Sequence, residues 1–249
     1  MSRTPSRLAA CLAATLLAGC IDYSETLEMR ADGSGTLTIR QTIDLSVLEN
    51  VKKLASSRGK KADLELLDVD EAAIRKALEG RAGLTIRSLA VADRTEGETT
   101  LRDVDLVVEF DRPESLVFGD ASLLVRPFAF ESTEDGGHRY ARQVGISATD
   151  IQRLIDRDEA RKAERGEVPQ PLDEKQLAGF RTLAAAFLAN RTAVFELHTP
   201  GPIANANVEA PGGVEGSVAT WRFDAFDLVA DSRTLEAVSG APPTGTGDR

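Results

Sequence analysis

The 249-residue sequence has little of the chemistry that most enzymes and metalloproteins use. It contains two cysteines and two histidines at no recurring ligand spacing, which argues against a structural zinc or redox site. The nucleophile elbow, the zincin helix, the Walker A loop and the dinucleotide-binding loop are all missing, so the common hydrolase and nucleotide-binding classes fit poorly. His138 and His198 are the sole candidate imidazole bases, and we expect both at the surface. We therefore expect no catalytic site, no metal and no cofactor.

The sequence also lacks an excess of basic residues and any long apolar run. Removing Arg3 and Arg7 with the leader described below leaves 28 basic against 40 acidic residues, a net charge of −12. Nucleic-acid binders depend on a basic surface, so this balance excludes non-specific nucleic-acid binding. Hydrophobic residues make up 42% and charged residues 28% of the chain, as in ordinary globular proteins.

An N-terminal leader is the most informative feature that is present. Arg3 and Arg7 precede an uncharged Ala/Leu-rich run at residues 8–19, which is too short to span a bilayer and is typical of a signal peptide. The run ends in Leu17-Ala18-Gly19-Cys20, which resembles the bacterial lipobox. In proteins with that signal the cysteine is acylated and the leader is cut before it. We therefore predict removal of residues 1–19 and a membrane partner held through acylated Cys20.

Two alternatives and a sorting signal accompany this prediction. Cys11 ends a second, weaker match, and an ordinary cleaved leader with an incidental cysteine is the other alternative. In enteric-type bacteria, aspartate directly after the acylated cysteine retains a lipoprotein in the inner membrane. Here that position is Ile21, followed by Asp22. We expect an extracytoplasmic protein of the cell envelope, on the outer membrane and facing the periplasm if the source has two membranes.

Alternation of apolar and polar residues predicts much of the body as strands. Residues 23–30 and 36–45 flank a turn at 31–35, where Asp-Gly and Gly tolerate the positive φ of a tight hairpin. The turn also matches the middle of an EF-hand loop, but Arg30 and Gln41 stand where two essential carboxylate ligands belong, which favours the plain turn. The remaining predicted strands are residues 84–92, 100–110, 123–131, 138–144, 192–198 and 217–223.

Capping signals and helical spacing predict several helices around this sheet. The predicted helices are residues 46–55, 68–80, 150–165 and 173–188. The apolar stripe of the last is either core or a partner surface. Prolines and glycines at residues 239–249 predict a disordered tail. The resulting prediction is an α+β fold, an antiparallel sheet flanked by several helices in one domain at residues 20–238.

Two groups of polar residues are candidates for binding. Asp103, Asp105 and Glu109 share one face of a predicted strand, which is typical of a solvated face, with a metal site as the alternative. Residues 199–213 form a long Pro-, Asn- and Gly-rich loop between two strands. Its candidate ligand contacts are Ile203, Asn205 and Asn207. We expect these residues to be exposed and to contribute little to stability. A wide hairpin connection, whose turn is set by Pro200 and Gly201, is the alternative.

Motifs near both ends of the chain carry a family resemblance. They are the lipobox cysteine, the hairpin Asp32-Gly33-Ser34-Gly35, the run Thr199-Pro200-Gly201-Pro202-Ile203, and then Asn207, Gly213, Gly216 and Trp221. In these features the chain resembles the LppM-like lipoprotein domain family of bacterial envelopes, well at both ends and less in the middle. The resemblance implies an extracytoplasmic α+β domain held at a membrane by its lipid, with lipid or glycolipid binding. It brings no catalytic residue with it.

The expected function is therefore that of a membrane-tethered envelope lipoprotein. We expect a protein that is not an enzyme and that binds a lipid, a glycolipid or an envelope protein. The alternative is an envelope hydrolase whose Ser/His/Asp or carboxylate site is scattered along the chain. A pocket converging on a histidine would favour the hydrolase, and an apolar cleft without converging titratable groups would favour the binding protein.

Overall fold

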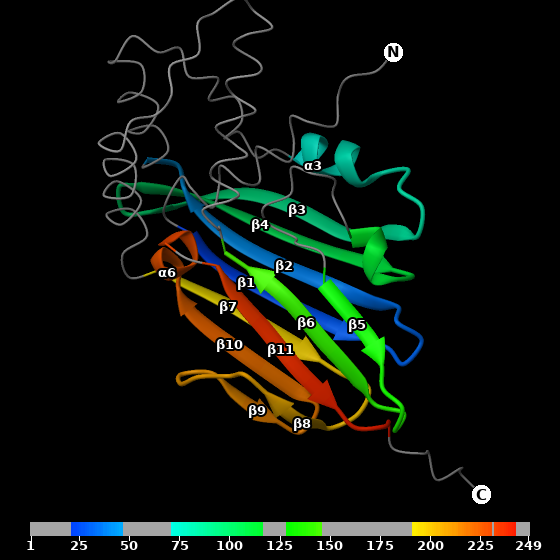
Figure 1. Ribbon diagram of the computed structural model, residues 1–249. Helices are drawn as coiled ribbons and strands as arrows, with labels where there is room; N and C mark the ends of the chain where they lie inside the picture. The colour runs from blue at the N-terminus through cyan, green and yellow to red at the C-terminus, as the bar shows by residue number, and fades with distance from the viewer. Residues whose placement is uncertain (1–20, 47–70, 117–127, 146–190, 231, 243–249) are drawn as a thin grey trace, which may run out of the picture.

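Two facing β-sheets make up most of the described chain (Figure 1). The computed structural model describes residues 21–46, 71–116, 128–145, 191–230 and 232–242. Sheet A has the spatial order β3-β4-β2-β1-β7-β10-β9, and sheet B has the order β5-β6-β11-β8. The strands of sheet A are β1 (Ile21–Met29), β2 (Gly35–Asp44), β3 (Leu84–Glu96), β4 (Thr99–Phe110), β7 (Thr192–His198), β9 (Gly213–Glu215) and β10 (Val218–Asp224). Those of sheet B are β5 (Phe128–Ser132), β6 (His138–Val144), β8 (Ile203–Ala206) and β11 (Arg233–Ser239).

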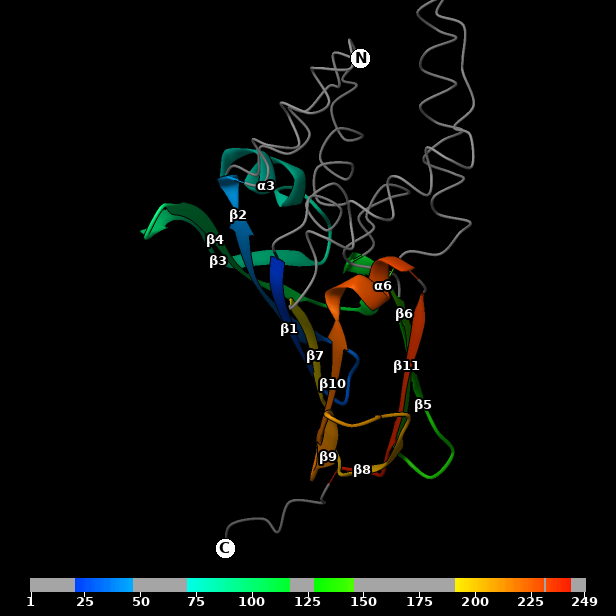
Figure 2. The same cartoon turned by 90° about the vertical axis from the view of Figure 1, so that its left-hand side faces the viewer.

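Alternation along the strands explains why the sheets face each other (Figure 2). In β1, Tyr23, Glu25, Leu27 and Met29 are buried, while the residues between them are more exposed. Successive side chains of a strand point to opposite faces, so these four share the inner face. The alternating apolar residues of β2 and β4 are buried in the same way: Leu37, Ile39, Ile43, Val104, Leu106, Val108 and Phe110. The core lies between the two sheets.

Aromatic rings connect the two layers across this core. Phe110 of sheet A lies edge-on to Phe128 of sheet B, with ring centroids 6.2 Å apart. Tyr140 of sheet B lies 5.8 Å from Phe128 and 6.2 Å from Trp221 of sheet A. Such tilted and edge-to-face pairs stabilise a core beyond the area that they bury.

The predicted α+β architecture of one antiparallel sheet flanked by several helices is wrong. Among the described residues, helix is limited to α3 (Glu71–Leu78), α6 (Ala225–Ala230), the 3₁₀ turn η2 (Pro113–Leu116) and the two residues after β2, and the partner of sheet A is a second sheet. Alternation shows that one face of a strand is buried, but it does not show what covers that face. Sheet A is also mixed, because β1 and β7 run parallel, with Tyr23 opposite Ala193.

One of the predicted helices is confirmed, and the other three lie almost entirely outside the described residues. The helix predicted at residues 68–80 is confirmed as α3, whose Ile74 and Leu78 are buried. Residues 47–55, 150–165 and 173–188 lie outside the described residues. None of the helices in the described part is long and apolar enough to cross a bilayer.

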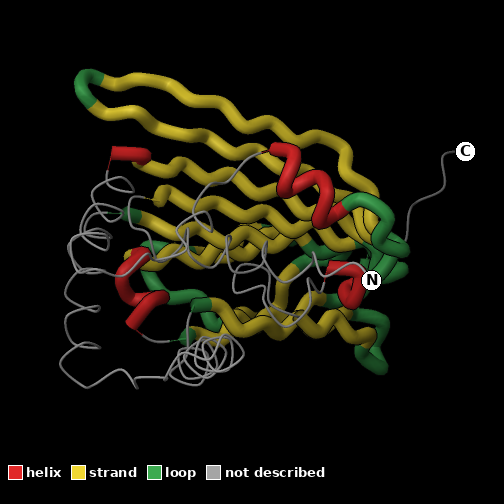
Figure 3. The backbone as a smooth tube through the Cα atoms, turned by 90° about the horizontal axis from the view of Figure 1, so that it is seen from above, coloured by secondary structure: helices red, strands yellow, loops and turns green. Residues whose placement is uncertain are grey.

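The predicted β1–β2 hairpin is confirmed, and the strands predicted at residues 84–92 and 100–110 form a second hairpin with longer strands. The β1–β2 turn has Gly33 at φ 83°, and the Asp32 carboxylate accepts hydrogen bonds from the Ser34 amide at 3.0 Å and hydroxyl at 2.7 Å. These are the contacts of a plain turn. The β3–β4 hairpin continues past the end of β2 at Asp44, which pairs with Leu101 (Figure 3).

Strands β8, β9 and β11 were not predicted. Strand β8 lies inside the predicted loop 199–213, and β11 ends at Ser239, the first residue of the predicted disordered tail. Ser239 is 2% exposed, and the Gly240 amide donates a hydrogen bond to the Pro202 carbonyl at 2.8 Å. The sheet therefore extends to the start of that tail, while residues 243–249 lie outside the described residues.

Candidate functional site

Several strand ends meet α6 at one end of the sandwich, which we call the α6 end. Strand β1 starts here at Ile21, opposite Ile43 near the end of β2, and Thr192 at the start of β7 pairs with Asp224 at the end of β10. The Ala225 amide donates to the Arg191 carbonyl at 2.9 Å, so α6 is attached directly to the sheet. The opposite end, which we call the hairpin end, carries the β1–β2 turn.

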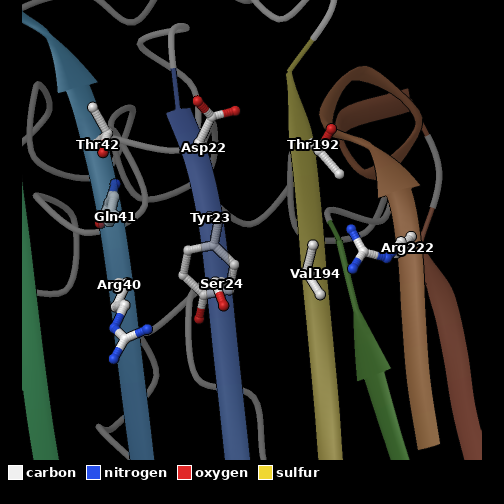
Figure 4. Close-up of a pocket in the computed structure, with 9 residues that line it drawn as sticks. All are labelled: Asp22, Tyr23, Ser24, Arg40, Gln41, Thr42, Thr192, Val194 and Arg222. Atoms are coloured by element: carbon white, nitrogen blue, oxygen red, sulfur yellow. The ribbon is translucent and has the colours of Figure 1, made fainter. Parts of the chain in front are cut away.

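A shallow, open depression of about 260 Å³ lies on the outer face of sheet A near the α6 end (Figure 4). Its central row is set by strand register, because Arg40 pairs with Ser24, Ser24 with Val194, and Val194 with Arg222. Directly paired residues share a face of the sheet. The residues that line the depression are Asp22, Tyr23, Ser24, Arg40, Gln41, Thr42, Thr192, Val194 and Arg222.

Two guanidinium groups stand at opposite ends of that row. Arg222 is exposed and makes no hydrogen bond or ion pair with any described residue. Arg40 is 3.5 Å from the Asp105 carboxylate, in a pair that water reaches on both sides. Exposed pairs of this kind contribute about 0–1 kcal/mol, so Arg40 remains available to another anion. Hydroxyls of neighbouring threonines and serine complete a surface suited to a small polar group that carries negative charge.

A buried ion pair lies behind the depression, on the inner face of sheet A. Glu25 of β1 and Arg142 of β6 are each 2% exposed at the side chain, and the guanidinium donates two hydrogen bonds to the carboxylate, one of them at 3.0 Å. The Tyr23 hydroxyl donates to the same carboxylate at 2.7 Å. Arg142 also lies 5.8 Å from the centre of the Phe195 ring. This cluster connects sheet A to sheet B and fixes β1 under the depression.

Burial keeps the two tyrosines of this region neutral. Burial, followed by the charge of Glu25, raises the pKa of Tyr23 well above its ordinary value. Burial likewise raises the pKa of Tyr140 to about 12. For Arg142, burial is the largest single influence and acts to lower the pKa, but the charge of Glu25, the two tyrosines and the hydrogen bond to Glu25 together outweigh it, so the net pKa is raised. The carboxylate and the guanidinium therefore carry the charges of the cluster.

The two histidines do not form a catalytic arrangement among the described residues. His138 is 5% exposed, so its predicted surface position is wrong: it stacks on Phe130 with 4.6 Å between ring centroids, and its Nε2 lies 3.3 Å from the Ala31 carbonyl. His198 Nε2 lies 2.5 Å from the Glu196 carboxylate on the outer face of β7. No described serine, threonine or cysteine is hydrogen-bonded to either ring. The hydrolase alternative thus gains no geometric support here.

The acidic row of β4 is paired with arginines. Asp103 accepts a hydrogen bond from Arg94 at 2.6 Å and one from the Thr42 hydroxyl at 2.7 Å. Glu109 pairs with Arg87 at 2.5 Å. Within the described ranges no group of three His, Cys, Asp or Glu side chains converges as a metal site would require.

The three candidate contacts of loop 199–213 occupy different environments. Ile203 starts β8 and packs, half-buried, against the core, whereas Asn205 is exposed. The Asn207 amide oxygen accepts hydrogen bonds from Trp221 Nε1 at 3.1 Å and from the Glu236 amide at 2.8 Å, and its nitrogen donates to the Thr234 carbonyl at 2.7 Å. Asn207 thus connects β10 of sheet A to β11 of sheet B, a role that the loop composition did not indicate.

The depression itself was not predicted from the sequence. Alternation along β2 places Arg40 on the outer face of its strand, but the four strands of the depression come from both ends of the chain. Residues 40 and 222 share a row through the parallel β1–β7 pairing, which alternation cannot reveal. Cys20 lies outside the described residues, and the described sheet begins at Ile21 directly after it.

No family model and no curated protein matches the sequence. Among solved structures, the folded domain of the Mycobacterium tuberculosis LppM protein, determined by NMR, has a TM-score of 0.39 to this chain with 8% sequence identity. The alignment covers 90% of this chain and 91% of that chain. At these values we transfer neither residue roles nor function from that protein.

Proposed function

We propose that this chain is a lipid-anchored lipoprotein of a bacterial envelope, that it is not an enzyme, and that it binds a polar headgroup in the depression of sheet A. One observation carries the proposal: β1 begins at Ile21, one residue after the predicted acylation site. Ile21 is already paired with Ile43, so no linker separates the predicted anchor from the described sheet. Two or three acyl chains on Cys20 would anchor it stably, whereas one chain binds marginally.

The depression favours a headgroup over an acyl chain as ligand. Its volume of about 260 Å³ is below that of typical ligand pockets, and it is open to solvent. Between the sheets, the space beside Glu25 is occupied by Arg142 and Phe195. The charges of Arg40 and Arg222 suit an anionic headgroup of an envelope lipid or glycolipid. An envelope protein with a carboxylate at the contact is the second candidate, favoured by the same two guanidiniums.

The anchor is tested by Cys20→Ser. We expect the wild-type protein in the membrane fraction and the variant unprocessed or released, because the acyl chains supply nearly all of the membrane affinity. Mass spectrometry of the wild-type N-terminus should show acylated Cys20, and Cys11→Ser is the matched control, which should fractionate like the wild type. Equal membrane association of both variants would contradict the proposal. If the source has two membranes, density-gradient separation should place the wild type with the outer membrane.

The ligand surface is tested by Arg222→Gln against Arg139→Gln. Both arginines are exposed on strands and have no partner among the described residues, but Arg139 lies on sheet B, away from the depression. Losing a charge-assisted hydrogen bond costs about 1.5–3 kcal/mol, so we expect Arg222→Gln to raise the Kd for dihexanoyl phosphatidylglycerol by roughly tenfold or more. Titration calorimetry of the full chain measures it. Equal affinities of the two variants would rule out the depression as the site.

A further inference from the structure

We infer that the membrane anchor has no spacer, so that the fold itself fixes the sandwich on the lipid surface with the α6 end against the headgroups. The inference rests on the proposed acylation of Cys20. It adds an interaction surface, the α6 end, and a partner, the plane of lipid headgroups.

Covalent geometry places the acyl chains beside the sheet. Consecutive Cα atoms are about 3.8 Å apart, so the Cα of Cys20 lies about that far from Ile21. Ile21 is already paired with Ile43 of β2. A flexible spacer of ten residues would instead have a root-mean-square end-to-end distance of roughly 17 Å, because this distance is about 5–6 Å times the square root of the number of residues. The sandwich could then take many positions relative to the membrane.

Strand β1 cannot swing relative to the body, because it lies in the middle of sheet A. Tyr23 is paired with Gln41 on one side and with Ala193 on the other. Its neighbour Glu25 is held by Arg142 of sheet B. Any reorientation of β1 would break two strand ladders and a buried ion pair, and a tether through its first residue therefore holds the whole sandwich.

The direction of β1 decides which end faces the membrane. The strand runs for nine residues from Ile21 to Met29, which at about 3.3 Å per residue takes the chain roughly 30 Å away from the anchor. The β5–β6 turn lies at that far end, since His138 contacts the Ala31 carbonyl. Helix α6 lies at the near end, following β10 directly (Figure 1).

The charges of the described residues at the α6 end do not provide an alternative cause of orientation. Asp22 is paired with Arg191 at 3.4 Å, and the Asp224 carboxylate accepts a hydrogen bond from the Phe226 amide at 2.8 Å. This mixture of signs differs from the polybasic segments that bind anionic membranes electrostatically. The orientation should therefore be the same on zwitterionic and anionic bilayers and insensitive to salt.

The depression consequently lies close to the headgroups. Asp22 and Ser24 are two and four residues after Cys20, about 7 and 13 Å along an extended strand. A headgroup of the same membrane reaches this surface from the side. If a long spacer joined the anchor to β1, the depression would meet soluble ligands as readily as lipid headgroups.

Spin labels at two acidic positions test the orientation. Asp227→Cys places a label on α6 and Glu134→Cys places one in the β5–β6 turn; both residues are exposed, and both changes remove one negative charge. The mature chain has no other free thiol, because its remaining cysteine is the acylated Cys20. In phosphatidylcholine vesicles with nickel-chelating headgroups, we expect several-fold stronger relaxation of the label at position 227 than of the label at position 134, at low and at high salt.

A spacer variant separates this inference from the proposed function. Ten Gly/Ser residues inserted between Cys20 and Ile21 should leave vesicle binding intact and reduce the difference between the two labels. Equal relaxation of both labels in vesicle-bound native protein, or a difference that survives the spacer, would overturn the inference. Failure of the processed protein to bind vesicles would instead overturn the proposed acylation.

Discussion

Replacing Arg142 by methionine is expected to lower the free energy of unfolding by about 3–5 kcal/mol, because it leaves the buried Glu25 carboxylate without its counter-charge. Glu25 is 2% exposed, so water cannot take the place of the guanidinium. The Tyr23 hydroxyl would remain as a donor to the carboxylate but carries no charge. Urea unfolding of the full chain, followed by the fluorescence of the single tryptophan, measures the change.

Two companion variants identify the cause of that loss. Arg139→Met changes an exposed arginine on the same strand and should shift stability by no more than about 0.5 kcal/mol. Glu25→Leu combined with Arg142→Met should recover most of the loss, since an apolar replacement of a buried pair is often neutral or stabilising. If Arg142→Met costs no more than Arg139→Met, the pair does not hold the sheets together.

Replacing Asn207 by alanine is expected to lower the free energy of unfolding by about 0.5–1.5 kcal/mol, although the residue is exposed. The change leaves Trp221 Nε1 and the Glu236 amide without their shared acceptor and frees the Thr234 carbonyl. Asn205→Ala is the matched control, because the same residue type two positions earlier on β8 is equally exposed but makes none of these hydrogen bonds; we expect a change of no more than about 0.5 kcal/mol. Equal midpoints in urea would show that the Asn207 hydrogen bonds do not stabilise the fold.

Both predictions test polar side chains that connect sheet A to sheet B. The described core joins two sheets, and polar side chains cross between them at Glu25–Arg142 and at Asn207. Both connections lie at or beside the strands that carry the depression, so stability measurements on these variants also report on how rigidly the candidate site is held. A ligand-binding experiment on Arg222 is informative because that side chain takes no part in either connection.

Local patterns determined the strands that have strong alternation and clear turns. The Asp-Gly turn placed the β1–β2 hairpin, and alternation from Val104 to Phe110 identified the buried face of β4. These signals depend on neighbours in the chain and can therefore be read without knowing the fold. Strand β11 was missed although Leu235 and Ala237 alternate inward, because its seven residues have few apolar side chains and are followed by a tail rich in proline and glycine.

By itself, the sequence determined the acidic net charge and most of the strands, and it predicts the leader and the acylation site at Cys20, since each of these depends on composition or on a continuous segment. Only the tertiary structure decided that a second sheet covers the first, that β1 and β7 run side by side, and that Arg40 and Arg222 share a row. It also showed Asn207 to be a connection between the sheets. The physical reason is that strand pairing and sheet packing depend on contacts between residues far apart in the chain, and alternation specifies a buried face without specifying its partner.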